Sequence, residues 1–149
     1  MFFLNPVLQW LDRRRDYGTL FIRLVVGVYL IYGTQDNVFS YARMIEFRDF
    51  LAAHKFPIPL FSAYLSVYAQ FSAGILYILG AFTRYAAAVM IINFIVAFVA
   101  VDLYQPYPRN FPAMVMLSSS LLLLFQGSGR PSVDAWLKSF VWKGSVRKR

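Results

Sequence analysis

The chain has 149 residues, of which 59% are apolar and only 15% charged, whereas soluble proteins average roughly 45–50% apolar and about 25% charged residues. A soluble domain this small could not cover so much apolar surface, so the composition excludes one. The net charge of +8 would suit nucleic acid, but the basic residues stand at the ends of apolar segments, which argues against a nucleic-acid partner and favours contacts with anionic membrane lipid.

The absence of cysteine excludes disulfides, thiolate catalysis and cysteine-ligated zinc or iron–sulfur clusters. We expect no cleavable signal peptide, because residues 1–11 lack an adequate apolar h-region. The expected fold is a single all-α integral membrane domain over residues 1–149, with short interfacial amphipathic helices. It comprises a cytoplasmic interfacial lead-in at 1–19, a bundle of four transmembrane helices at 20–126 and a basic cytoplasmic tail at 127–149.

The chain opens on a helix start that precedes the first apolar segment. Asn5 suits an N-cap and Pro6 suits the first helical position. Residues 6–15 are therefore predicted to form a short interfacial helix, with a disordered polar lead-in as the alternative. Residues 20–38 are the first predicted transmembrane helix, close to the ~20 residues that a bilayer core needs.

A polar connection over residues 40–59 follows. It carries apolar residues at helical spacing among charged ones, so we predict an amphipathic helix at the far interface, containing Ile45, Phe47, Phe50 and Leu51. The prolines of residues 56–59 end it. Residues 60–82 and 85–104 are the second and third predicted transmembrane helices. The turn between them is so short that these two helices must lie antiparallel and pack closely.

Both of these helices carry a stripe of small and polar residues, which lets helices approach closely. The stripes consist of Ala63, Ser66, Gln70, Gly74 and Tyr77 in one helix and Ala86, Met90, Asn93, Ala97 and Ala100 in the other. Gln70 and Asn93 fall near the middle of their helices. Because a buried amide in lipid needs a partner, each is a candidate hydrogen-bond partner for the other.

The fourth transmembrane helix is predicted from residue 111 or 112 to residue 125, which is short for a span. The stretch from Gln126 to Gly129 ends it. Ser132 then caps a final amphipathic segment, whose apolar residues are Val133, Trp136, Leu137 and Phe140.

Basic residues divide unequally between the two sides of the predicted bundle. Eleven of the 15 stand on the side of both termini and the second loop, and the other side holds Arg43, Arg48, Lys55 and Arg109. The positive-inside rule therefore places both termini in the cytoplasm.

Four blocks of sequence, spread in order over residues 20–137, carry a family pattern. They are Arg23-Leu-Val-Val-Gly27, Phe50-Leu-Ala-Ala53 with Phe56-Pro-Ile-Pro59, Gly74-Ile-Leu-Tyr-Ile-Leu-Gly80-Ala-Phe-Thr83-Arg84-Tyr-Ala86, and Gly127-Ser-Gly129-Arg130-Pro-Ser132-Val-Asp134. Together they resemble the DoxX family of small four-helix membrane proteins. The resemblance implies a protein of the bacterial cytoplasmic membrane. It also implies an accessory subunit in thiosulfate:quinone oxidoreduction or a membrane partner in oxidative-stress complexes.

The chain departs from its relatives at two places. Relatives often carry a carboxylate where Gln70 stands, and histidines where this chain reads Val101-Asp102-Leu103-Tyr104. The resemblance therefore carries no proton, metal or redox role over to these positions.

Few residues offer catalytic or metal-binding chemistry. His54 is the only histidine, and typical zinc sites need three or four side-chain ligands. A serine–histidine–acid triad would need the same residue together with a nucleophile elbow, which is missing. We therefore predict no catalytic residue, no metal site and no intrinsic cofactor.

The remaining polar residues give two hypotheses. A cavity between the helices could hold an apolar ring with two polar ends, such as a quinone, and its predicted lining is Arg23, Tyr29, Tyr32, Gln70, Tyr77 and Asn93. Ion pairing near the helix ends is predicted for Asp36, Asp102, Arg109, Arg84 and Asp134. In this second hypothesis Arg23 lies near Asp134 or the Thr83–Arg84 turn, while the far-end carboxylates meet Arg109 or Arg43.

The leading functional hypothesis is an accessory or partner-binding subunit of a redox-linked membrane complex, because the chain lacks side chains for electron transfer. The partner would be another membrane protein or a second copy of this chain. The alternative is a quinone- or lipid-binding subunit of a membrane oxidoreductase. A transporter has little support, because the chain shows no evident internal repeat or broken helix.

Overall fold

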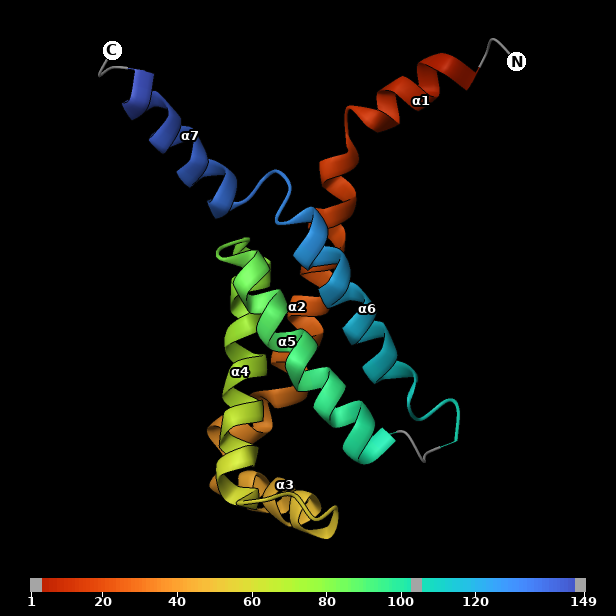
Figure 1. Cartoon of the computed structure of the whole chain (residues 1–149), viewed down its shortest axis with the longest axis vertical. Coiled ribbons are helices and arrows are strands. Elements are labelled where there is room, and N and C mark those ends of the chain that lie inside the picture. The colour runs from red at the N-terminus through yellow and green to blue at the C-terminus, as the bar shows by residue number, and fades with distance from the viewer. Residues whose placement is uncertain (1–3, 103–105, 147–149) are drawn as a thin grey trace.

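A computed structural model describes residues 4–102 and 106–146, and every regular element in those ranges is helical (Figure 1). The elements are α1 Leu4–Asp12, α2 Arg15–Phe39, α3 Tyr41–Ala53, α4 Pro59–Leu79, α5 Thr83–Ala97, the π-helix η1 Phe98–Asp102, α6 Phe111–Gln126 and α7 Val133–Val146. The all-α membrane architecture expected from the sequence is confirmed. The predicted end of the third helix at Tyr104 and the last three basic residues of the tail lie outside the described ranges.

Among residues 4–102 and 106–146, three helices are long and apolar enough to cross a membrane: α2, α4, and α5 with its continuation to Val101. The fourth predicted span, α6, has 16 residues, which corresponds to about 24 Å at 1.5 Å per residue and is shorter than a hydrocarbon core of about 30 Å. Helix α2 begins at Arg15, five residues before the predicted start, because helical hydrogen bonding continues through polar residues that precede the apolar stretch.

The helices meet in one main core between α2, α4, α5 and α6. Val26, Leu30, Tyr77, Met90 and Leu123 are among its buried side chains. The apolar residues that face away from this core are exposed, as expected for side chains that contact lipid rather than water. The small residues of the predicted stripe on α4 divide between two neighbours, since Gly74 faces α2 while Ala63 belongs to a second cluster with α3.

Helix α3 closes the end of the molecule remote from both chain ends (Figure 1). Its buried residues are Met44 and Leu51, which pack against Ala63 and Val67 of α4. Of the four apolar residues predicted for an interfacial face, Leu51 is thus in a core, while Phe50 is exposed. At the opposite end, α1 and α7 project away from the bundle on either side (Figure 1).

Candidate functional site

Arg23 is the centre of a buried junction at the end of the bundle that carries the termini. Its side chain is 1% exposed and donates only to backbone carbonyl groups. Nε donates to Tyr77 O at 2.9 Å, Nη2 donates to Ile78 O at 3.4 Å and Pro131 O at 3.2 Å, and Nη1 donates to Ser128 O. One guanidinium therefore joins the last turn of α4 to the loop that follows α6.

The backbone around this guanidinium is shaped to admit it. Helix α4 is capped at its C-terminus by Gly80, which is in the left-handed conformation with φ of 65°, and the last carbonyls of a helix lack helical partners. A Cβ added to Gly80 would lie 2.6 Å from Arg23 Nη1. Glycine is thus required at this position both for its backbone conformation and for the space that the cation fills. The planar fork of five donors suits several carbonyls at once, which a lysine ammonium could not reproduce.

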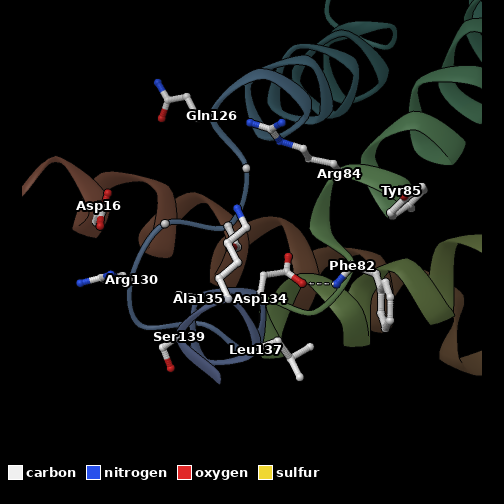
Figure 2. A pocket seen from close by; sticks show the side chains of 14 residues that line it. Asp16, Phe82, Arg84, Tyr85, Gln126, Arg130, Asp134, Ala135, Leu137 and Ser139 are labelled. Carbon is white, nitrogen blue, oxygen red and sulfur yellow. Dashed lines mark hydrogen bonds between the residues drawn. The ribbon is translucent and has the colours of Figure 1, made fainter. Parts of the chain in front are cut away.

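Asp134, at the start of α7, caps the N-terminus of α5. One carboxylate oxygen accepts the backbone N–H of Phe82 at 2.8 Å (Figure 2). The other accepts the N–H of Thr83 at 3.1 Å, and the backbone N–H of Asp134 donates to Gly80 O at 2.9 Å. A carboxylate at a helix N-terminus satisfies free amides and interacts favourably with the helix dipole. The α4–α5 turn is thereby held at both ends: Arg23 binds carbonyls at the end of α4, and Asp134 binds amides at the start of α5.

The ion pairs predicted at this end take a different form. Arg84 Nη2 donates to Phe125 O at 3.1 Å, near the last turn of α6. Within the described ranges, neither Arg84 nor Asp134 forms an ion pair. Both side chains bind backbone at helix ends instead, because unpaired amides and carbonyls at those ends compete for the charges.

At the far end, the described ion pairs lie within α3. Arg43 pairs with Glu46 at 2.7 Å and Arg48 with Asp49 at 2.6 Å. The hydrogen bond that Arg43 donates to the Glu46 carboxylate raises the pKa of Arg43, and the nearby charges of Glu46 and, less strongly, Asp36 act in the same direction. The Asp36 carboxylate is close enough to act on Arg43 through its charge, but Glu46 is the direct partner of that arginine.

Asp102 and Arg109 are the other two residues predicted to pair at this end. Arg109 lies exposed in the loop before α6. The side chain of Asp102, the last residue of η1, is outside the part of the chain that the structure describes.

A second site is a pocket between α4 and α5, closed at the far end by α3 and bordered by α2 and α6. Its volume is about 780 Å³, and most of its lining is apolar. A polar chain of three side chains crosses it. Gln70 Nε2 donates to Ser66 Oγ at 3.0 Å, and Ser66 Oγ donates to Asn93 Oδ1 at 2.9 Å. Gln70 and Asn93 are thus linked through Ser66 rather than directly.

This chain of hydrogen bonds has a direction, which leaves a group free at each end. In the described part of the molecule, Asn93 Nδ2 and Gln70 Oε1 have no hydrogen-bond partner. The pocket therefore offers a free amide NH2 group at one end of the chain and a free amide oxygen at the other, in mostly apolar surroundings. Such groups fix the orientation of a mostly apolar ligand.

The six residues predicted to bind a ligand lie in three different places in the structure. Tyr29, Gln70 and Asn93 line the pocket. Arg23 and Tyr77 belong to the packed junction instead, where the Tyr77 hydroxyl donates to Ser120 Oγ at 3.4 Å. The side chain of Tyr32 is 74% exposed on the outer face of α2.

Ser66 is the central residue of the polar chain, and sequence reasoning gave it only a packing role. The signal that could have found it is its position one helical turn before Gln70 on the predicted stripe, where a hydroxyl meets the amide.

No metal site emerges among residues 4–102 and 106–146, since they hold no group of three or more His, Cys, Asp or Glu side chains able to ligate an ion. The His54 ring packs at 4.4 Å from the Phe50 ring, with Nδ1 2.8 Å from Phe50 O.

Comparison with protein families matches residues 18–103 to DoxX. This chain is a member of the DoxX family. The match runs from the start of α2 through η1, so it includes Arg23, the α4–α5 turn and the polar chain of the pocket. The Gly127–Asp134 block, which also resembles the family, lies outside the matched residues. Searches of curated proteins and of solved structures found no match.

Proposed function

We propose that this DoxX protein is a subunit of a redox-linked membrane complex and that it holds a quinone or a similar apolar molecule in the pocket between α4 and α5. The observation that carries the proposal is the polar chain of Ser66, Gln70 and Asn93 inside an apolar pocket of about 780 Å³. A polar group placed in a membrane interior is costly unless it has a partner. A ligand that supplies both a donor and an acceptor would satisfy both ends of the chain.

The quinol form meets this requirement in full, because its hydroxyl groups both donate and accept, whereas the quinone form satisfies only the donor end of the chain. Its ring carbonyl oxygens can accept from Asn93 Nδ2, and the hydroxyl of the corresponding quinol can donate to Gln70 Oε1. The isoprenoid tail would lie along the apolar lining. A lipid with a hydroxyl or ester group near one end is the second ligand class that fits the same groups.

The proposed role is that of a binding subunit, because the chain brings no side chain suited to electron transfer. It has no cysteine and one histidine, and that histidine packs against Phe50. Electrons to or from a bound quinone would pass to a separate subunit that carries a redox group. We therefore propose another membrane protein as the partner, with a homo-oligomer as the alternative.

We further propose that the protein resides in the bacterial cytoplasmic membrane with both termini in the cytoplasm. Support comes from the excess of basic residues at the end that carries α1 and α7, and from the position of both chain ends there (Figure 1). An even number of crossings is needed for this arrangement. Helix α6 is therefore proposed as the fourth crossing, in a locally thin part of the bilayer.

Quinone binding tests the central proposal. The full chain would be reconstituted in lipid nanodiscs, and the affinity for a ubiquinone analogue measured for wild type, Asn93→Leu and Ser66→Ala. Loss of the free donor in Asn93→Leu is expected to weaken binding about tenfold. Ser118→Ala is the matched control, because Ser118 is exposed and donates to Met114 O of its own helix. No saturable binding to wild type, or equal affinity in wild type and Asn93→Leu, would reject the quinone site.

The partner requires a separate test. A tagged full-length chain would be purified in mild detergent from native membranes, after cross-linking. The proposal predicts that a second membrane protein with a redox cofactor copurifies. Consistent recovery of a monodisperse monomer would contradict it.

A further inference from the structure

A second pocket lies at the end of the molecule that carries the termini, well apart from the proposed quinone pocket. Its volume is about 850 Å³, and its walls are the start of α5, the loop after α6 and the first turns of α7 (Figure 2). Three cationic side chains line it: Arg84, Arg130 and Lys138. It therefore combines a concave shape with basic charge at a membrane boundary.

The charges in this pocket are not neutralised by ion pairs. Two carboxylates, Asp16 and Asp134, also line it. The Asp134 carboxylate is taken up by the N–H groups at the start of α5. Within the described ranges, none of the three cations forms an ion pair, and Arg130 and Lys138 make no hydrogen bond through their side chains. The pocket thus holds more cationic donors than its own acids engage.

The rim of the pocket is apolar and aromatic. Phe82 and Tyr85 line it with 59% and 75% of their surfaces exposed, and Leu137 lines it from α7. On the same helix, Trp136 and Phe140 are exposed and their rings contact each other at 4.9 Å. Exposed aromatic rings beside basic side chains are typical of the membrane–water interface. A soluble anion would gain nothing from this rim, whereas a phospholipid would contact both parts.

We propose that this pocket binds the headgroup of an anionic phospholipid. Arg130 and Lys138 contact the phosphate, Arg84 adds its remaining donors, and the aromatic rim contacts the glycerol and upper acyl chains. The bound lipid would secure α7, which is tied to the bundle at its first turn through Asp134. The inference stands on this pocket alone and does not depend on the proposed quinone role.

The test uses the full chain in a mild non-ionic detergent, with lipid binding measured by native mass spectrometry. The lipids are phosphatidylglycerol and phosphatidylcholine of equal chain length. Arg130→Gln combined with Lys138→Gln is the test variant, and it leaves the helix-capping contact of Arg84 intact. Because each basic residue near an anionic surface contributes on the order of 1 kcal/mol, the double variant is expected to bind phosphatidylglycerol about 30-fold more weakly.

The matched control removes two charges from the same end but outside the pocket, by Arg13→Gln with Arg15→Gln. Its affinity for phosphatidylglycerol should stay close to that of wild type, and circular dichroism should show both variants folded. An equal loss in the control would mean diffuse attraction of charge rather than a site. Equal affinity for the two lipids, or unchanged binding in the test variant, would overturn the proposal. Displacement of the lipid by excess inorganic phosphate would identify a free anion as the ligand and would also overturn it.

Discussion

Gly27 of α2 and Gly74 of α4 face each other where these two helices cross. A Cβ added to either glycine would lie 2.8 Å from the carbonyl oxygen of the other. The contact is therefore backbone against backbone, the form of packing by which membrane helices approach most closely. It places α2 beside the α4 face that carries Tyr77, and so it sets the position from which Arg23 reaches the end of α4.

Gly27→Ala and Gly74→Ala are each expected to destabilise the protein by about 1–3 kcal/mol, because an added methyl group meets backbone that cannot move aside. The measurement is the thermal unfolding temperature of the purified protein in detergent. Gly33→Ala is the matched control on α2, since nothing lies within 4 Å of its added Cβ. It should be neutral or slightly stabilising, because alanine favours helix over glycine. Equal destabilisation by all three variants would show that the crossing is not the cause.

The helices and the integral membrane class of the protein could be predicted from the sequence, because long apolar segments and their small-residue stripes are local signals. Contacts between residues on different helices were harder to predict from the sequence. Gly74 was recognised as a packing residue, but Gly27 lies on another helix and was not paired with it. The rotational position of α2 was also missed. Its buried positions include Arg23 and Leu30, and a residue two places after Leu30 points about 200° away, which turns Tyr32 outward.

The role of Arg23 shows the same limit. Its placement near the Thr83–Arg84 turn followed from its position at the helix end. Its partners could not follow, because they are carbonyls of the α4 terminus and of the loop after α6. Because every residue carries a backbone carbonyl group, residue type does not show which carbonyl accepts a hydrogen bond. A sequence pattern therefore suggests an acid as the partner of an arginine even where the fold supplies carbonyl groups.

Replacement of Arg23 should loosen two segments at once. Arg23→Gln is expected to cost about 3 kcal/mol of stability, since several buried carbonyls lose their donors. The measurements are thermal unfolding and the rate of proteolysis in the 127–132 loop. Arg23→Lys should rescue only part of the loss, because a single ammonium cannot span both segments. Arg48→Gln is the control, because Arg48 makes its ion pair on the surface of α3. Wild-type resistance to proteolysis in Arg23→Gln would contradict the junction.

Asp134 should stabilise the start of α5 through its capping bonds. Asp134→Ala is expected to cost about 1 kcal/mol, and the loss should appear as faster amide hydrogen exchange in the first turn of α5. Asp134→Asn keeps an oxygen acceptor and should retain part of the protection. Ser139→Ala, on the same helix, serves as the control, because Ser139 donates only to Trp136 O. Unchanged exchange at residues 82–86 in Asp134→Ala would show that the cap is not formed in the membrane.

The proposed orientation can be mapped cleanly because the chain contains no cysteine, so every introduced thiol is a single label. Lys55→Cys lies beyond α3 at the far end, and Arg130→Cys lies in the loop before α7, and both positions are exposed. With both termini in the cytoplasm, an impermeant maleimide added to intact spheroplasts should label Lys55→Cys at once. Arg130→Cys should be labelled only after the membrane is permeabilised. The reverse pattern would place the basic end outside, against the charge asymmetry. Labelling of both positions from outside would place them on the same side, which requires an even number of crossings between residues 55 and 130, namely α4 and α5 without α6. Helices α4, α5 and α6 lie between these positions. Because α4 and α5 are both long and apolar enough to cross, opposite labelling requires α6 to cross as well, and this experiment therefore also decides whether the short helix α6 spans the bilayer.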